Sequence, residues 1–176
     1  MLSIKRVWSY GALVASMVTM PAIFGQQAAT EPKSAITPSH FIVQAGDVKW
    51  TNPPAGTAIG TPSVDTGKPL RYALIEGDPS KPGAPFTIRL GCDDGFIAAP
   101  HWHPTAENIV VLKGTFALGA GDTFNSSSMQ DIATGGYGYM PSRMHHFGQC
   151  KGETDLLIYG IGPFQINFVS GPKSQN

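Results

Sequence analysis

Histidine and glutamate side chains in one short stretch of this chain are spaced to hold a metal ion. His101 and His103 are separated by one residue, and Glu107 follows four residues later. In a strand, residues two apart face the same side, so both imidazoles would point one way. A second cluster, His145 and His146, lies further along the chain. Imidazole nitrogens and a carboxylate oxygen suit a first-row transition metal better than magnesium or calcium.

The elements that must position these side chains are short strands separated by turns. Turn residues recur at short spacing, and no apolar stripe of helical period follows the first residues of the chain. This pattern predicts an all-β sandwich or barrel. Gly114 is expected to form a turn, and residues 119–131 an irregular link. Strands are expected over 41–44, 48–50, 70–76, 86–90, 101–103, 107–113, 115–118, 135–140, 145–149, 156–161 and 164–169.

The first 25 residues have the composition of a secretory signal peptide. Lys5 and Arg6 precede an apolar run over 7–24, and cleavage is expected near Gly25. A single transmembrane anchor is the alternative, although the run is of marginal length for a span. We therefore expect a periplasmic or secreted protein with no stable membrane insertion after cleavage. Residues 26–69 would form a flexible arm, N-terminal strands and a loop, and residues 70–176 the barrel.

Composition and charge limit the classes of molecule that this protein could bind. The chain has 176 residues, enough for one domain, with 12 basic and 12 acidic residues and no basic stripe. Nucleic acid is therefore not expected as a partner, whereas a small molecule is. In an oxidising compartment, Cys92 and Cys150 would form a disulfide or remain two separate buried thiols, and the sequence leaves both open.

Two motifs in the chain resemble those of the cupin superfamily. The first runs glycine, five residues, His-x-His, three residues, glutamate, six residues and glycine, and it is complete from Gly95 to Gly114. In the second, Gly135, Pro141 and His146 match. Arg143 stands where the second motif has its middle glycine, and Cys150 stands where it has its final asparagine.

This resemblance covers residues 70–169 and implies a double-stranded β-helix, the jelly-roll barrel. It implies that His101, His103, Glu107 and His146 are metal ligands pointing into the barrel. His145 has the opposite parity in its strand and is expected at the rim or beside the ligands, although a slip of one residue would exchange the two histidines. The resemblance further implies a homodimer to which residues 41–48 could contribute.

Several other residues are candidates for contact with a bound substrate. The guanidinium of Arg143 could hold a carboxylate by two parallel hydrogen bonds, the alternative being a solvated loop arginine. Aromatic and aliphatic side chains are candidates for the pocket wall, with core packing as the alternative: Phe86, Ile88, Ile109, Val111, Tyr137, Tyr139, Met144 and Phe147.

The sequence thus predicts one divalent transition metal, which could be copper, iron, manganese or zinc. Loading after export favours copper or zinc, whereas loading before folded export would keep manganese or iron. We favour an exported metal-dependent oxidoreductase acting on a small oxygenated or sugar-like substrate, because an aerobic compartment and an imidazole-rich site both favour redox metals. A binding module without turnover and a non-redox isomerase or lyase are the alternatives.

Overall fold

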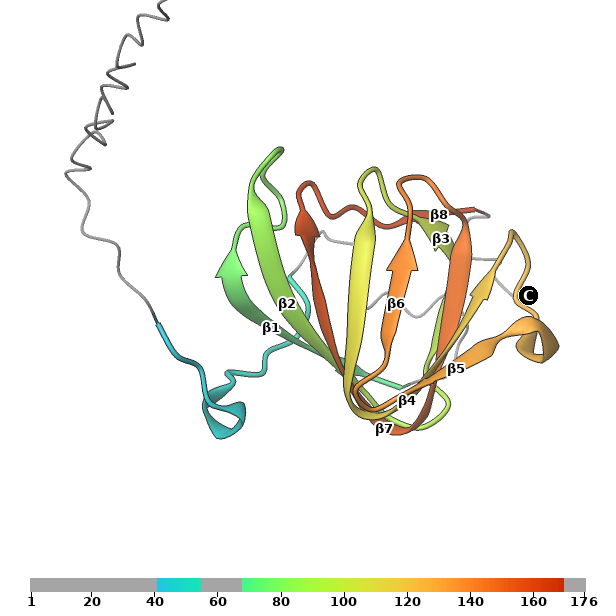
Figure 1. Cartoon of the computed structure of the whole chain (residues 1–176), viewed down its shortest axis with the longest axis horizontal. Coiled ribbons are helices and arrows are strands. Elements are labelled where there is room, and N and C mark those ends of the chain that lie inside the picture. The colour runs from blue at the N-terminus through green and yellow to red at the C-terminus, as the bar shows by residue number, and fades with distance from the viewer. Residues whose placement is uncertain (1–40, 55–67, 170–176) are drawn as a thin grey trace, which may run out of the picture. The chain divides into compact units, whose positions relative to one another are not determined.

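Residues 41–54 and 68–169 are described by a computed structural model of the chain. They form eight strands and two 3-10 helices, η1 (Ala45–Asp47) and η2 (Ser126–Ser128), and the strand pairs are antiparallel. The strands curve around a common interior (Figure 1), which confirms the predicted all-β jelly-roll barrel. They are β1 (Leu70–Gly77), β2 (Pro85–Cys92), β3 (Ile97–Trp102), β4 (Glu107–Ala120), β5 (Gln130–Ala133), β6 (Tyr137–Met140), β7 (His146–Ile161) and β8 (Asn167–Phe168).

Two long strands, β4 and β7, form the spine of the barrel. They pair with each other from Asn108 opposite Tyr159 to Ala120 opposite His146. On its other edge, β7 pairs first with β3 and then with β2, while β4 also pairs with β5 and β6. Because β7 pairs with β2, β3 and β4, its register fixes which side chains meet inside the barrel.

The turn predicted at Gly114 is wrong, because the strand continues through it. Gly114 has a φ of 75°, and the β4–β7 register shifts on both sides of Lys113. The two strands predicted at 145–149 and 156–161 are likewise one strand, in which Gly152 has a φ of 74°. Positive φ values suit glycine, so both glycines bend long strands instead of ending them.

We expect Gly114→Ala to destabilise the barrel by about 3 kcal/mol, because two costs combine there. Alanine is strained at positive φ, and a β-carbon at this position would overlap the carbonyl oxygen of Glu153. Gly152 is a matched control, since its φ is similar but nothing lies within 4 Å of an added β-carbon. Gly152→Ala should cost only about 1 kcal/mol in denaturant unfolding. Equal losses in the two variants would contradict the overlap with Glu153.

Three further expectations differ from the structure. The strands predicted within residues 41–50 are absent; this stretch contains η1, and Thr51 forms an isolated bridge to Tyr72. Phe41 and Ile42 are exposed and do not belong to the buried core. The last strand is confined to β8, and β5 forms where a link was expected to end. Strand propensity decides little without a pairing partner.

Apolar side chains from strands around the eight-stranded sheet pack in the barrel interior. The buried cluster comprises Leu70, Tyr72, Phe86, Ile88, Leu90, Cys92, Phe96, Ile109, Val111, Phe116, Met140, Cys150, Leu156, Ile158 and Phe164. Cys92 and Cys150 form a disulfide with their Cα atoms 6.4 Å apart. Of the two possibilities that the sequence left open, a disulfide or two separate thiols, the disulfide is therefore correct.

The predicted signal peptide over residues 1–25 and most of the arm and loop between 26 and 69 lie outside the described residues. Over 41–54 and 68–169, no helix is long and apolar enough to cross a membrane.

Candidate metal centre

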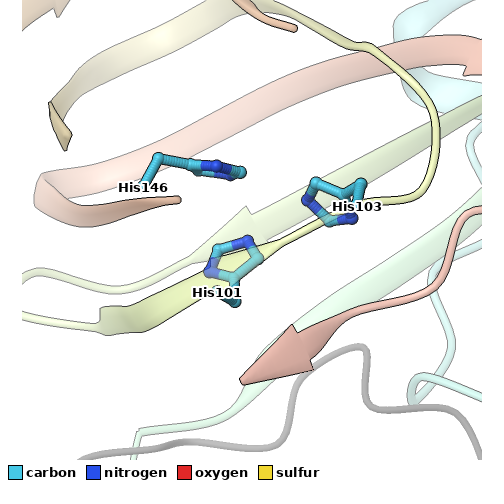
Figure 2. Close-up of side chains that lie close together, drawn as sticks. All are labelled: His101, His103 and His146. Carbon is cyan, nitrogen blue, oxygen red and sulfur yellow. The ribbon is translucent and has the colours of Figure 1, made fainter. Parts of the chain in front are cut away.

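The ends of three strands bring the candidate ligands together at one end of the barrel. His101 lies near the end of β3 and His103 just after it, while Glu107 begins β4 and His146 begins β7. The β3–β7 register places His101 directly opposite His146. Figure 2 shows the three imidazole rings turned toward a common space.

The ligand atoms are close enough to share one ion. One ring nitrogen from each of the three histidines lies within 4.8 Å of the others, so this cluster could hold a metal ion. The carboxylate of Glu107 adjoins it, with Oε2 3.4 Å from Nε2 of His103 and 3.2 Å from Nε2 of His146. All four side chains are buried, with at most 7% of each residue exposed.

Backbone carbonyls fix the orientation of all three rings. Nδ1 of His101 donates to the carbonyl of Ala99 at 2.5 Å, and Nδ1 of His146 donates to that of Met144 at 2.9 Å. Nδ1 of His103 donates at 2.8 Å to the carbonyl oxygen of Gln165. Because a carbonyl oxygen only accepts, each Nδ1 carries the proton, and in the neutral ring Nε2 keeps its lone pair. Such a second hydrogen bond is what orients metal-ligating imidazoles.

The electrostatic environment of the site favours a bound cation. Burial, with the neighbouring His146 and His103 imidazoles, lowers the pKa of His101 to about 3, so this ring is neutral at neutral pH. Burial raises the pKa of Glu107, but charge attraction and hydrogen bonding from His103 and His146, which act when those rings carry a proton at Nε2, outweigh this effect and leave that pKa below its usual range. Glu107 is therefore a buried anion beside rings that can bind metal.

The residues present fit a metal ion. Nε2 of His103, Nε2 of His146 and Oε2 of Glu107 are buried without a hydrogen-bond partner. Unpartnered buried polar atoms are costly, and a buried carboxylate is more costly still. A divalent cation among them would satisfy all three atoms and displace any proton shared between the carboxylate and an imidazole.

A cavity of about 70 Å³ opens from the ligands into the barrel. Its wall is mostly apolar, with side chains from β1, β2, β3, β4 and β7 and from the segment around β8. The volume is several times the roughly 10–15 Å³ that one water needs on this scale. The centre therefore has room beside it for a small ligand.

Two of the predicted site residues, His145 and Arg143, do not line the cavity beside the ligands. Nδ1 of His145 is 2.6 Å from Oδ1 of Asp122 at the surface, so this ring faces outward. Arg143 has a φ of 63°, which explains why the family motif has glycine there. Its guanidinium lies 5.7 Å from the ring of Trp102, and its backbone N–H donates to the carbonyl of His103 at 2.8 Å.

The other candidates divide between the core, the surface and the pockets. Phe147 is fully buried and packs on Phe124 at a ring separation of 5.4 Å, on the strand face opposite His146. Tyr139 is 54% exposed and lines a second hollow together with Met144 and His146. Of the remaining candidates, Ile109 lines the cavity; Phe86, Ile88 and Val111 pack in the core, and Tyr137 is exposed.

Two contacts to the imidazoles escape prediction from the sequence. Phe164 stacks on the ring of His103, with centroids 4.4 Å apart and planes 14° from parallel. The neighbouring Gln165 contributes its backbone carbonyl, which any residue type could supply. The apolar 164–169 pattern predicts a strand and carries no sign that this segment supports a ligand.

Comparison with known proteins supports the fold. No protein-family model and no curated protein matches the sequence. Among solved structures, the polyketide cyclase RemF from Streptomyces resistomycificus is similar, with a TM-score of 0.56, 14% identity and coverage of 77% of this chain and 89% of that one. A proposed acetylacetone dioxygenase from Methylibium petroleiphilum PM1 has a TM-score of 0.54, 21% identity and coverage of 83% and 90%. An acetylacetone dioxygenase from Acinetobacter johnsonii has a TM-score of 0.52, 15% identity and coverage of 78% and 81%.

These likenesses concern the fold, since all three identities are low. The antiparallel barrel agrees with them, and the complete motif from Gly95 to Gly114 lies on β3 and β4 beside the three-histidine cluster. The chain therefore has the fold of the cupin superfamily.

Proposed function

We propose that this protein is a metal-dependent oxidoreductase that binds one divalent transition metal through His101, His103, His146 and Glu107. The observation that carries the proposal is the orientation of the rings: three Nδ1–H groups are held by carbonyls, and Nε2 of His103 and of His146 lie beside the carboxylate of Glu107. An imidazole-rich set with one carboxylate favours copper, iron, manganese or zinc over the oxygen-seeking ions.

The protein residues would position the metal and shield the reaction. The backbone carbonyls behind the imidazoles prevent the rings from rotating away, and Glu107 supplies a negative charge that offsets the cation. When bound, the metal supplies a site at which a substrate oxygen or dioxygen can be activated. The stacked ring of Phe164 and the apolar wall exclude bulk water from the space beside the ligands.

The cavity favours a small oxygenated substrate over a sugar. The polar or charged side chains in its described wall are the four candidate ligands; the rest of the lining is apolar, glycine or disulfide. A sugar would bury several hydroxyl groups without partners there, which costs free energy for each group. Two of the similar structures are described as acetylacetone dioxygenases, and acetylacetone is a small molecule with two oxygens.

Elemental analysis of protein purified from the periplasm or culture medium tests the metal directly. We expect about one transition metal per chain, removed by a chelator and restored by titration. At a free metal concentration of about 100 times the dissociation constant, binding should stabilise the fold by about 2.7 kcal/mol. Absence of metal and of stabilisation by all four ions would contradict the proposal.

Oxygen uptake separates the oxidoreductase from a lyase, a cyclase or a binding module. With the metal restored and acetylacetone as the first test compound, we expect oxygen consumption that stops on chelation. The cyclase among the similar structures makes a non-redox reaction the second candidate. Turnover that proceeds equally without oxygen would favour that candidate, and saturable binding without turnover would favour the module.

We also propose that the protein works outside the cytoplasm after removal of residues 1–25. The Cys92–Cys150 disulfide supports this, because such bonds persist mainly in oxidising compartments. Amino-terminal sequencing of the same purified protein should find a start near Gln26. A start at Met1 would contradict removal of the signal.

A further inference from the structure

The cavity beside the candidate metal centre has two chemically different ends. His146, Gly148 and Cys150 alternate along β7, share one face of that strand and all line the cavity. Four residues of strand span about 13 Å, so the disulfide lies roughly that far from His146. The imidazoles and Glu107 occupy one end, and the Cys92–Cys150 disulfide forms the floor at the other.

Between these ends the wall carries no charged side chain among the described residues. Its lining is aliphatic and aromatic: Leu70, Leu90, Phe96, Ile109, Phe116 and Leu156 are examples. The same residues are buried and belong to the core cluster or pack against it. Apolar cavities of this kind favour hydrocarbon over water, because water inside would lack hydrogen-bond partners.

We propose that the site takes an elongated ligand with an oxygen-donor head at the imidazole end and an uncharged hydrocarbon tail that runs toward the disulfide. This inference rests on the proposed function for the head, but the tail follows from the wall alone. The length of the tail is limited, because Cys92, Cys150 and Phe96 line that end of the cavity and at most 5% of each is exposed.

The length and charge of the tail then decide affinity. Each methylene moved from water into an apolar cavity strengthens binding about fourfold. The gain ends when the tail reaches the floor. A charged group at the end of the tail would be buried without a partner, so it should cancel the gain and lower the affinity further.

A series of alkyl hydroxamates tests the inference on the zinc-loaded full chain. Hydroxamates bind metal through two oxygens, so aceto-, butyro-, hexano- and octanohydroxamate differ only in tail length. Isothermal titration calorimetry should show butyrohydroxamate binding on the order of tenfold more tightly than acetohydroxamate. The affinity should then level off or fall at a longer tail. Succinic acid monohydroxamate matches the butyro compound in length but ends in a carboxylate, and it should bind at least about tenfold more weakly.

Two variants of the wall should shift the preferred tail length in opposite directions. Leu156→Ala removes bulk from the wall and should favour a longer tail, whereas Ala98→Leu, at the residue paired with Gly148, should favour a shorter one. Zinc content measured after each titration must remain about one per chain, so that the head is held constant. If a variant does not fold, the alkyl hydroxamates and succinic acid monohydroxamate titrated into the wild type still test the inference.

The outcomes separate the two proposals. An affinity that does not change with tail length, or an equal affinity for the carboxylate-ended compound, on protein that holds zinc, overturns the apolar-tail inference and leaves the metal centre intact. Protein that binds none of copper, iron, manganese and zinc overturns the proposed function and the inference with it. Tail-length dependence that shifts with the wall variants supports the inference.

Discussion

His146→Ala is expected to abolish stoichiometric metal binding, whereas His145→Ala leaves it unchanged. The two residues are neighbours, but only His146 pairs with His101 and faces the ligand cluster. Loss of a residue that merely supports a ligand costs about 10- to 100-fold in metal affinity, and loss of a ligand should cost more. The affinity of the His146→Ala variant should therefore fall by more than about 100-fold.

His145→Ala is a close control because it removes the same ring one position away. Its contact with Asp122 lies at the surface, so the fold should lose less than about 1 kcal/mol. Calorimetric titration of the metal-free variants, with elemental analysis of the products, measures both effects. The reverse pattern would mean that β7 is displaced by one residue from the register described here.

The ligands of the metal centre can be predicted from the sequence because their positions follow from local spacing along the chain. His101 and His103 share a face through strand periodicity, and the spacing to Glu107 and Gly114 matches one motif. The choice between His145 and His146 depends on parity, and the register of β7 against β3 places His146 inside. Where a side chain's direction follows from a period of two, the sequence alone is informative.

The features of the fold and of the site that the sequence does not predict depend on contacts between residues far apart in the chain. Gly114 needs positive φ, which the sequence indicates, but only pairing with β7 keeps the chain extended through it. The stretch around Phe41 has strand-like residues, but within 41–54 and 68–169 no strand pairs with it, and it contains η1 instead of a strand. The backbone carbonyl of Gln165 accepts a hydrogen bond from His103, 62 residues away in the chain. The type of side chain at position 165 does not indicate this contact, because the backbone makes it.

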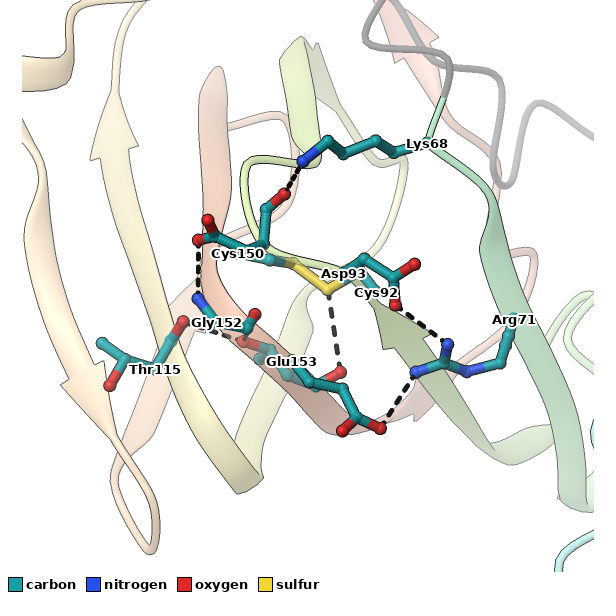
Figure 3. Close-up of a disulfide and its surroundings, with 10 residues drawn as sticks. Lys68, Arg71, Cys92, Asp93, Thr115, Cys150, Gly152 and Glu153 are labelled. Carbon is teal, nitrogen blue, oxygen red and sulfur yellow. Dashed lines mark hydrogen bonds and ion pairs between the residues drawn. A yellow bond between two sulfur atoms is a disulfide. The ribbon is translucent and has the colours of Figure 1, made fainter.

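The disulfide occupies the place where β7 changes partners. β7 pairs with β3 up to Gln149 and with β2 only from Thr154, and Cys150 lies in the interval. Polar contacts cluster around the bond (Figure 3): Arg71 reaches Asp93 and Glu153, and the backbone N–H of Gly152 donates to Asp94 at 2.7 Å. The cross-link therefore joins β2 to β7 where no ladder of strand pairing does.

Reduction of this bond is expected to lower the free energy of unfolding by about 4 kcal/mol, the loop-entropy value for cysteines 58 residues apart. Each cysteine is only 1% exposed, so the reductant should reach the bond through the unfolded chain. Reduction should leave the other side chains as they are in the oxidised protein. Denaturant unfolding with and without a phosphine reductant measures the difference. Both arms use metal-free protein, because metal binding would add its own stability.

The double variant Cys92→Ala/Cys150→Ala separates the cross-link from the reductant. It should be less stable than the oxidised wild type, and its unfolding should not respond to reductant. Both cysteines also line the cavity, so the variant leaves space at the floor and should fall below the reduced wild type by a further cavity cost, about 1 kcal/mol or more. Equal stability of the oxidised and reduced wild type would show that the polar contacts around Arg71 and Asp94 hold β2 against β7 without the covalent bond.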